Sequence, residues 1–185
     1  MRPLYKAYDD VYTRKEYYRC HYSKTPYRGI YKRIADNVGK EESVVELGSG
    51  TGQLMEMLLD NGIRSYIGYD FSQVGLDLAK EKIRERDVQL IYQDLYELTS
   101  LPEADVYIAV EVFEHLKDDC DKKLLSLIPK GKKVLISVPS YLGGSHVRKF
   151  DSELEIIARY TEIECKKITP VGSKERIFIV VGEKL

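Results

Sequence analysis

Glu111, Glu114 and His115 place two carboxylates and an imidazole within five residues of the sequence. His146 supplies a second imidazole further along the chain. Imidazole titrates near neutral pH, so His115 and His146 are candidate catalytic bases that could take a proton from a reacting group, and Glu111 is a candidate partner in that chemistry. Two simpler roles stay open, since His115 could orient the end of a strand and His146 could lie in a loop.

These side chains are expected at the ends of two buried strands. The apolar run at 104–110 predicts a strand that leads directly into the acidic pair. Residues 132–138 predict another strand, which is followed by a loop at 139–150 that carries His146. Ligands of open α/β sheets bind beyond the carboxyl ends of the strands, so the sequence predicts that these groups converge on one cleft. Two adjacent glycines make the loop a candidate lid.

A glycine-rich turn at 48–52 separates a β-branched run from a helical pattern. Residues 44–47 predict a strand, and the apolar residues after the turn recur with helical spacing. Glycines allow both a sharp turn and the close approach of a ligand. A dinucleotide fingerprint would have glycine or alanine where this chain has Gln53, which argues against a nicotinamide-dependent oxidoreductase. The turn also lacks the lysine of a phosphate-binding P-loop.

Polar residues end the next two predicted strands. Asp70 closes a strand at 65–70, where a carboxylate can accept hydrogen bonds from both hydroxyls of a ribose. Asp94 and Leu95 follow a strand at 88–92, where they could bond the edge of an adenine and cover its face. Simpler roles stay open here too, because Asp70 could be a surface acid or a cap and Asp94 could be an ordinary cap.

The order of these elements predicts the fold. Strands alternate with helices, which is typical of a parallel sheet, but about seven residues join the last two strands, too few for a parallel crossover. We therefore expect an α/β fold with a Rossmann-like, doubly wound, seven-stranded sheet, mostly parallel with one antiparallel strand, and helices on both faces. The chain is expected to form a single domain, with a cap of one or two helices at 1–40 and a core at 41–185. Ser72 and Asp151 are expected to cap two of the helices.

Composition limits the classes of function. Hydrophobic residues make up 43% and charged residues 32%, and no apolar run could span a bilayer, so a soluble cytoplasmic protein with no membrane partner is expected. Three scattered cysteines fit reduced thiols. Residues 1–40 carry ten Lys/Arg against four Asp/Glu, a balance of +6, and eight of the 15 tyrosines. This segment could favour an anionic partner, nucleic acid included, or could be the solvated face of amphipathic helices. Nothing in the sequence indicates the oligomeric state.

Together these features resemble the class I methyltransferases that use S-adenosylmethionine (SAM). The resemblance rests on Glu-Leu-Gly-Ser-Gly-Thr-Gly at 46–52, on Asp70, on the Asp94-Leu95 pair and on Glu-Val-Phe-Glu-His at 111–115. Within the class, Glu-Val-Phe-Glu-His-Leu at 111–116, Ser-Val-Pro at 137–139 and His-Val-Arg-Lys-Phe-Asp at 146–151 are similar to the group of ubiquinone-biosynthesis-type O-methyltransferases. The resemblance implies SAM as the cofactor.

The resemblance also implies which residues bind the cofactor. It assigns this site to Glu46, Gly48, Ser49, Gly50, Gly52, Asp70, Phe71, Asp94, Leu95 and Glu111. The glycine turn and Glu46 would face the methionine part of SAM, and Asp70 would hold the ribose with Phe71 beside the adenine. Glu111 would follow the strand backbone that contacts the methionine amino group. N-terminal tyrosines or Arg28 would complete the pocket.

The activity that the resemblance implies is methyl transfer to a hydroxyl or amine of a small-molecule acceptor. The sulfonium of SAM is already activated, so the protein has to align the acceptor, exclude water and, where needed, take a proton. No metal ligand is assigned. Two alternatives stay open. Glu-x-x-Glu-His at 111–115 with His146 also resembles the metal-binding pattern of small-RNA 2′-O-methyltransferases, and the chain could be a non-catalytic SAM-binding module.

Overall fold

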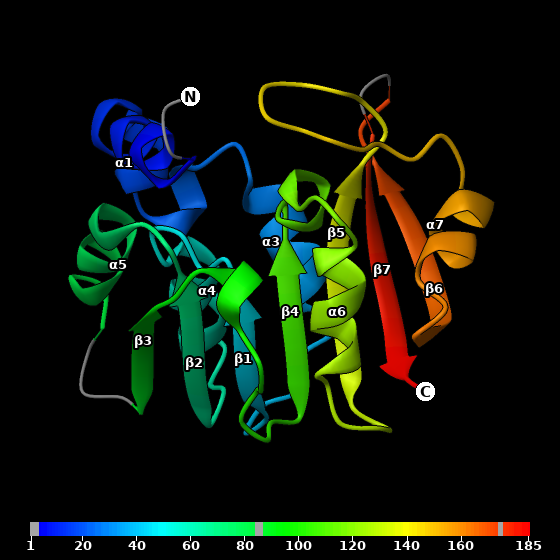
Figure 1. The fold of residues 1–185 in the computed structure, drawn as a ribbon. Coiled ribbons are helices and arrows are strands. Elements are labelled where there is room, and N and C mark those ends of the chain that lie inside the picture. The colour runs from blue at the N-terminus through cyan, green and yellow to red at the C-terminus, as the bar shows by residue number, and fades with distance from the viewer. Residues whose placement is uncertain (1–3, 84–86, 174–175) are drawn as a thin grey trace. The chain divides into compact units, whose positions relative to one another are not determined.

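Figure 1 shows the fold of the chain in a computed structural model, which describes residues 4–83, 87–173 and 176–185. The chain forms two compact units, Met1–Glu97 and Leu98–Leu185, which are described in turn. Within the described ranges, none of the helices combines the length and the apolar character that a bilayer span requires. The expectation of a single domain with a helical cap stays a prediction.

Three parallel strands form the sheet of the first unit, in the order β3-β2-β1. They are β1 (Ser43–Leu47), β2 (Ser65–Asp70) and β3 (Val88–Tyr92). Every residue of β1 is buried, as expected for a parallel strand that is covered on both faces. Because Leu47 pairs with Tyr69, the carboxyl ends of β1 and β2 lie side by side.

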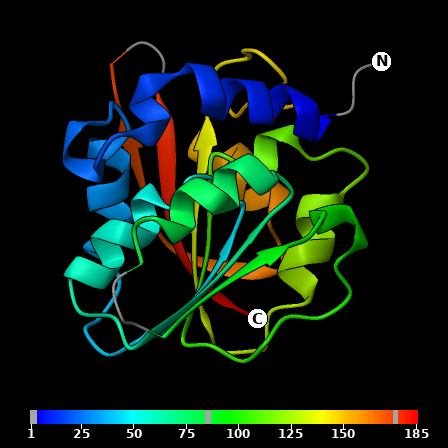
Figure 2. The same ribbon diagram turned by 90° about the vertical axis from the view of Figure 1, so that its left-hand side faces the viewer.

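Short helices connect and precede these strands. They are α1 (Leu4–Arg14), α2 (Glu16–Arg19), α3 (Arg28–Ala35), α4 (Gln53–Asp60) and α5 (Gln73–Lys80), with 3-10 turns η1 (Tyr22–Lys24) and η2 (Leu95–Glu97). The N-terminal segment thus holds more and shorter helices than predicted, because Lys15 and Cys20 take extended backbone conformations on either side of α2. Figure 2 shows α1 lying along α5, against which it packs. The predicted cap at Ser72 is confirmed, since its hydroxyl accepts a hydrogen bond from the Gly75 N–H (3.0 Å).

Among the described residues of the second unit, four strands form a sheet in the order β4-β5-β7-β6. They are β4 (Val106–Val110), β5 (Lys133–Pro139), β6 (Ile163–Val171) and β7 (Ile177–Lys184). Strands β4 and β5 are parallel, whereas β7 is antiparallel to both β5 and β6. The predicted antiparallel pair at the end of the chain is therefore confirmed, and so is the predicted α/β class with a mostly parallel, seven-stranded sheet.

The helices of this unit are α6 (Cys120–Ser126) and α7 (Glu153–Arg159), and a 3-10 turn, η3 (Phe113–His115), follows β4. The prediction of a cap at Asp151 is wrong. Ser152 has the extended conformation that an N-cap needs, and its hydroxyl accepts a hydrogen bond from the Glu155 N–H (3.3 Å). The Asp151 carboxylate instead forms an ion pair with Lys149 (2.6 Å).

Candidate functional site

The glycine turn after β1 has the backbone geometry that only glycine takes without strain. Gly48, Gly50 and Gly52 have φ values of 77°, 52° and 71°. The N–H groups of Gly48 and Ser49 both donate to the Tyr69 carbonyl, at 2.8 and 3.0 Å, so the turn is fixed to the end of β2. The Ser49 side chain is buried within the turn. The predicted strand–turn–helix unit is therefore present.

Gly52 is also required for packing. A Cβ at this position would lie 2.8 Å from the Cβ of Ala79 and 2.9 Å from the Met55 Cε. The start of α4 therefore approaches α5 more closely than any side chain at position 52 would allow.

Asp70 connects the turn to the start of α5. One of its carboxylate oxygens accepts from the Gly50 N–H and the other from the Ser72 N–H, both at 2.8 Å. The side chain is 3% exposed, and burial raises the pKa of its carboxyl to about 6, with the nearby charge of Asp9 adding to the shift. Each oxygen keeps a further lone pair, so the carboxylate could also accept from a hydroxyl.

The side chain of Glu46, in β1, is buried as well. Its carboxylate accepts a hydrogen bond from the Tyr66 hydroxyl. Burial raises the pKa of Glu46 to about 8, although the hydrogen bond from Tyr66 acts in the opposite direction. A carboxyl with a pKa near neutrality can exchange a proton or accept a cation under ordinary conditions.

The residues predicted to contact the adenine differ in their exposure. The exposed Asp94 accepts a hydrogen bond from the Tyr96 N–H (2.9 Å), so the capping role that the sequence left open is observed at η2. Leu95 is buried, and the half-buried Phe71 meets the ring of Tyr8 edge to face, with ring centroids 5.6 Å apart. The adenine role of these residues stays a prediction.

Helix α1 brings three side chains to the turn. The ring of Tyr12 is 7% exposed, and its hydroxyl lies 3.1 Å from the position that a Cβ on Gly50 would take. Asp9 accepts a hydrogen bond from the Ser72 hydroxyl, and Tyr8 contacts Tyr12 at a centroid distance of 5.8 Å. Tyr12 thus lies at the turn and Arg28 is exposed at the start of α3, while the role of the tyrosines in the pocket stays a prediction.

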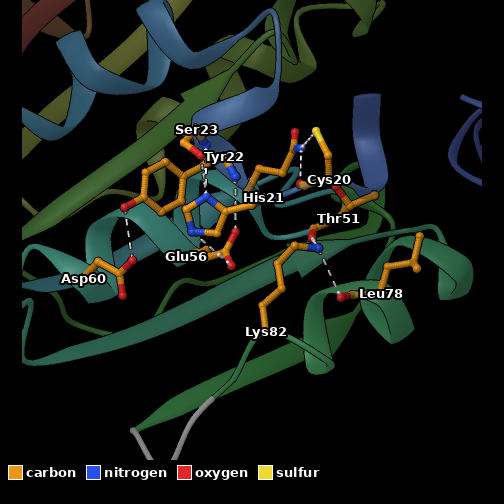
Figure 3. Close-up of polar contacts among 10 residues, drawn as sticks. Cys20, His21, Tyr22, Ser23, Thr51, Glu56, Asp60, Leu78 and Lys82 are labelled. Atoms are coloured by element: carbon orange, nitrogen blue, oxygen red, sulfur yellow. Dashed lines mark hydrogen bonds and ion pairs between the residues drawn. The ribbon is translucent and has the colours of Figure 1, made fainter. Parts of the chain in front are cut away.

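Gln53 has a role that the sequence did not reveal. Its side-chain amide donates to the carbonyls of Tyr17 (2.9 Å) and Cys20 (2.7 Å), and the Thr51 hydroxyl donates to the Tyr18 carbonyl. Figure 3 shows that the residues which follow this segment contact α4, for example through the bond from the Tyr22 hydroxyl to Asp60. The glutamine that argues against a dinucleotide therefore fastens residues 17–20 to the turn. No periodicity or motif could have shown this, because the partners are backbone carbonyls distant in sequence.

In the second unit, Glu111 lies immediately after β4 in a left-handed conformation, with φ of 54°. The Ser137 hydroxyl accepts from the Glu111 N–H (2.8 Å) and donates to its carboxylate (2.7 Å). Burial raises the pKa of Glu111, while the bond from Ser137 opposes the shift. Positive φ at a residue with a side chain is uncommon, and such residues concentrate at functional sites.

The two predicted histidines come together. The rings of His115 and His146 meet edge to face with centroids 4.8 Å apart, and the His115 Nε2 lies 3.8 Å from Glu114 Oε1. His115 Nδ1 is hydrogen-bonded to the Ser145 hydroxyl (2.9 Å), and His146 Nδ1 to the Tyr141 carbonyl (3.2 Å). Burial, assisted by the neighbouring His146, lowers the pKa of His115 to about 4, so His115 is neutral near pH 7.

Glu114 is the most deeply buried member of this group. Its side chain is fully buried, and burial together with the charge of Glu111 raises the pKa of its carboxyl well above the ordinary value. Neither of its oxygens has a hydrogen-bond partner among the described residues. A buried carboxylate without a donor is unusual, because its desolvation is uncompensated.

The loop at 139–150 is tied to η3. The Val147 N–H donates to the Glu114 carbonyl and Arg148 donates to the Phe113 carbonyl, both at 2.7 Å. Arg148 also forms an ion pair with the fully buried Asp121 (2.6 Å), which Arg159 contacts as well (2.8 Å). These contacts hold His146 against His115. The sequence did not indicate that Asp121 would be buried.

Known proteins share the fold of this chain. Residues 44–130 match the model of a family described as "Methyltransferase domain". The N-methyltransferase NodS from Bradyrhizobium japonicum WM9, solved with S-adenosylhomocysteine, superposes with a TM-score of 0.79 at 13% identity, covering 97% of each chain. Magnesium protoporphyrin IX methyltransferase from Synechocystis PCC 6803, solved with SAM, gives 0.68 at 18% identity over 98% of this chain and 99% of that one.

A third neighbour is 1,6-didemethyltoxoflavin-N1-methyltransferase from Burkholderia thailandensis, with a TM-score of 0.71 at 17% identity, covering 97% of this chain and 83% of that one. A search of curated proteins finds no match. Residues 44–130 thus match a methyltransferase domain, and the chain has the fold of the SAM-dependent methyltransferases, the class whose methyl donor is SAM. The predicted enzyme class is confirmed. Membership of the ubiquinone-type group stays a prediction.

Proposed function

We propose that the protein transfers a methyl group from SAM to a hydroxyl or amine of a small-molecule acceptor. The observation that carries this proposal is the turn at Gly48–Gly52, with three glycines at positive φ and with Asp70 bonded to its backbone. Such a turn lets a ligand reach the backbone and places a carboxylate at its side, which fits the methionine and ribose parts of SAM.

The residues of the first unit would bind the cofactor. The glycine turn and Glu46 would face the methionine part, Asp70 would accept from the ribose, and Phe71 and Leu95 would cover the adenine. Tyr8 and Tyr12 of α1 would shield the site from water, because their rings already lie on Phe71 and on the turn. Bound SAM supplies an electrophilic methyl group, so no further activation of the donor is needed.

Residues of the second unit would handle the proton of the acceptor. His115 is neutral near pH 7, because burial lowers its pKa to about 4, so it can accept a hydrogen bond from an acceptor hydroxyl but is a weak base. His146 is the second candidate base. An amine acceptor that is already unprotonated needs neither.

Two observations favour a small acceptor. Two of the neighbours are named for small-molecule acceptors, magnesium protoporphyrin IX and 1,6-didemethyltoxoflavin. Residues 1–40 and the 139–150 loop are the segments left to recognise an acceptor, as no long insertion interrupts the predicted core. We place the acceptor in the hydroxyl-bearing or amine-bearing metabolites, with the ubiquinone-type O-methyltransferases as the model group.

Calorimetry with SAM and S-adenosylhomocysteine tests the cofactor half of this proposal. We expect micromolar binding by the wild type and a loss of about 100-fold or more in Asp70→Ala, with Asp77→Ala, an exposed acid of α5, as the matched control. No binding by the wild type, or equal binding by Asp70→Ala, would refute it. Incubation with radiolabelled SAM and fractionated cell extract then tests transfer. A protein that binds SAM but labels no fraction is the non-catalytic module instead.

A further inference from the structure

Three side chains of the second unit bring one possible ligand atom each close together. They are Glu114 and His115 of η3 and His146 of the following loop, and these atoms lie within 4.8 Å of one another. Glu114 is fully buried, whereas the two histidines are partly exposed. The group is thus closed on the carboxylate side and open to solvent on the imidazole side.

Glu114 lacks the partners that a buried carboxylate needs. Its two oxygens have no hydrogen-bond donor within the part of the chain that the structure describes. The guanidinium of Arg148, whose charge acts on Glu114, is directed to Asp121 (2.6 Å) and to the Phe113 carbonyl (2.7 Å). A carboxylate in this situation costs several kcal/mol unless a proton or a cation neutralises it.

The hydrogen bonds of the histidines prepare them as ligands. The Tyr141 carbonyl can only accept, so His146 Nδ1, 3.2 Å away, carries the proton and Nε2 of the neutral ring keeps its lone pair. His115 Nδ1 is likewise held, by the Ser145 hydroxyl (2.9 Å). Metal-binding histidines typically have their second nitrogen bonded to a backbone carbonyl or a similar partner, which fixes the ring.

We propose that Glu114, His115 and His146 form a binding site for a divalent transition-metal ion, with Zn²⁺ as the best fit. Two imidazoles and one carboxylate are the ligand set of an open, three-ligand zinc site, whose fourth position takes water or substrate. Hard ions such as Mg²⁺ and Ca²⁺ prefer oxygen ligands and fit less well. In a tetrahedral site the ligand atoms lie ~3.4 Å apart, so metal binding draws these three groups together by about an ångström.

If the protein also transfers a methyl group as proposed, the metal site restricts the chemical class of the acceptor. A hydroxyl oxygen that occupies the open position is acidified by the ion, so the acceptor class becomes an alcohol or phenol rather than an amine. The two histidines then act as ligands and not as free bases. This consequence rests on the proposed methyl transfer, but the metal site itself does not.

Titration of the chelator-treated full-length chain with Co²⁺ tests the site. Co²⁺ reports its coordination through visible absorption, and Zn²⁺ is then added to displace it. We expect one equivalent to bind with the spectrum of a low-coordinate site and to be displaced by Zn²⁺. Glu114→Gln and His146→Gln should each weaken binding by about 100-fold or more, since even the loss of an outer-shell partner costs 10–100-fold. His21→Gln alters the third histidine of the chain and should leave binding unchanged.

Three outcomes would overturn the proposal: no stoichiometric binding by the wild type, equal affinity in both cluster variants, or a loss in His21→Gln. Far-UV circular dichroism and SAM calorimetry on the same samples show whether each variant is folded. They also separate the two proposals, because a protein that binds SAM but no metal refutes only the metal site. A last outcome concerns wild-type protein that has been shown to bind Zn²⁺. If its methyl transfer is unchanged after a chelator removes the metal, only the restriction to alcohol or phenol acceptors is refuted.

Discussion

The glycine turn of the first unit and the Glu114–His115–His146 cluster of the second differ in how their buried acids are satisfied. Asp70 accepts two backbone hydrogen bonds and Glu46 accepts one from Tyr66. Glu114 is buried at least as deeply and has no donor among the described residues. The two acids at the turn are therefore satisfied by the protein itself, whereas no donor to Glu114 lies among the residues that the structure describes. The proposed cofactor site would therefore be formed before its ligand binds, whereas the proposed metal site would be completed by its ion.

The largest expected effect concerns the pH dependence of stability and the carboxyl of Glu46. Its pKa is about 8 in the folded state against 4.5 ordinarily, so between these values the folded protein holds a proton that the unfolded chain has released. The free energy of unfolding should therefore fall as pH rises through this window. The release of this one proton lowers it by as much as roughly 5 kcal/mol. Denaturant unfolding at pH 5 and pH 8 should show this loss in the wild type and a smaller one in Glu46→Gln, where only the raised pKa values of Asp70, Glu111 and Glu114 still contribute. Glu103→Gln, whose side chain is 81% exposed, is the control, and an unchanged slope in Glu46→Gln would contradict the assignment.

The second prediction tests whether close packing at the turn requires glycine at position 52. Gly52→Ala places a Cβ 2.8 Å from Ala79 at a φ of 71°, and we expect a loss of about 3–4 kcal/mol in unfolding free energy. Gly131→Ala is the matched control, because its φ is 75° but nothing lies within 4 Å of the added Cβ, so only the strain of about 1 kcal/mol remains. Equal losses in both variants would show that packing at Gly52 is unimportant.

The third prediction contrasts the two acids directly. Asp70→Asn keeps the size of the side chain but replaces one acceptor oxygen by a donor that faces a backbone N–H, and it should cost about 2 kcal/mol. Glu114→Gln removes no hydrogen bond, so it should change the stability of chelator-treated protein by less than about 1 kcal/mol. Thermal and urea unfolding measure both. A larger loss of unfolding free energy in Glu114→Gln than in Asp70→Asn would contradict the contrast between the two acids.

The smallest expected effect concerns Gln53. Gln53→Ala leaves the Tyr17 and Cys20 carbonyls without their donor and should cost about 1–2 kcal/mol. Gln73→Ala, on the exposed face of α5, should cost less than about 0.5 kcal/mol. Urea unfolding distinguishes the two, and a silent Gln53→Ala would mean that water replaces the amide at no cost.

Sequence patterns located the elements that carry the site, because those patterns reflect local physics. Three glycines in a short turn, an acid at the end of β2 and a short connection before β7 each follow from backbone conformation or from chain length. The patterns missed contacts that depend on the packing of distant segments. Examples are the attachment of residues 17–20 to Gln53, the ion pairs of buried Asp121, and the missing donor of Glu114. Asp151 and Ser152 are equally good caps by residue type, and only the backbone conformation at Ser152 decides between them.

The hydrogen bonds from Thr51 and Gln53 to residues 17–20 have a thermodynamic consequence for ligand binding. The family match begins at residue 44, yet the turn shares its hydrogen bonds with a segment well before that point. Binding at the turn and docking of this segment are therefore linked equilibria, and linkage is reciprocal. A change that loosens residues 17–20 should therefore weaken the proposed binding at the turn, by the same factor by which the bound ligand would have strengthened the docking of these residues.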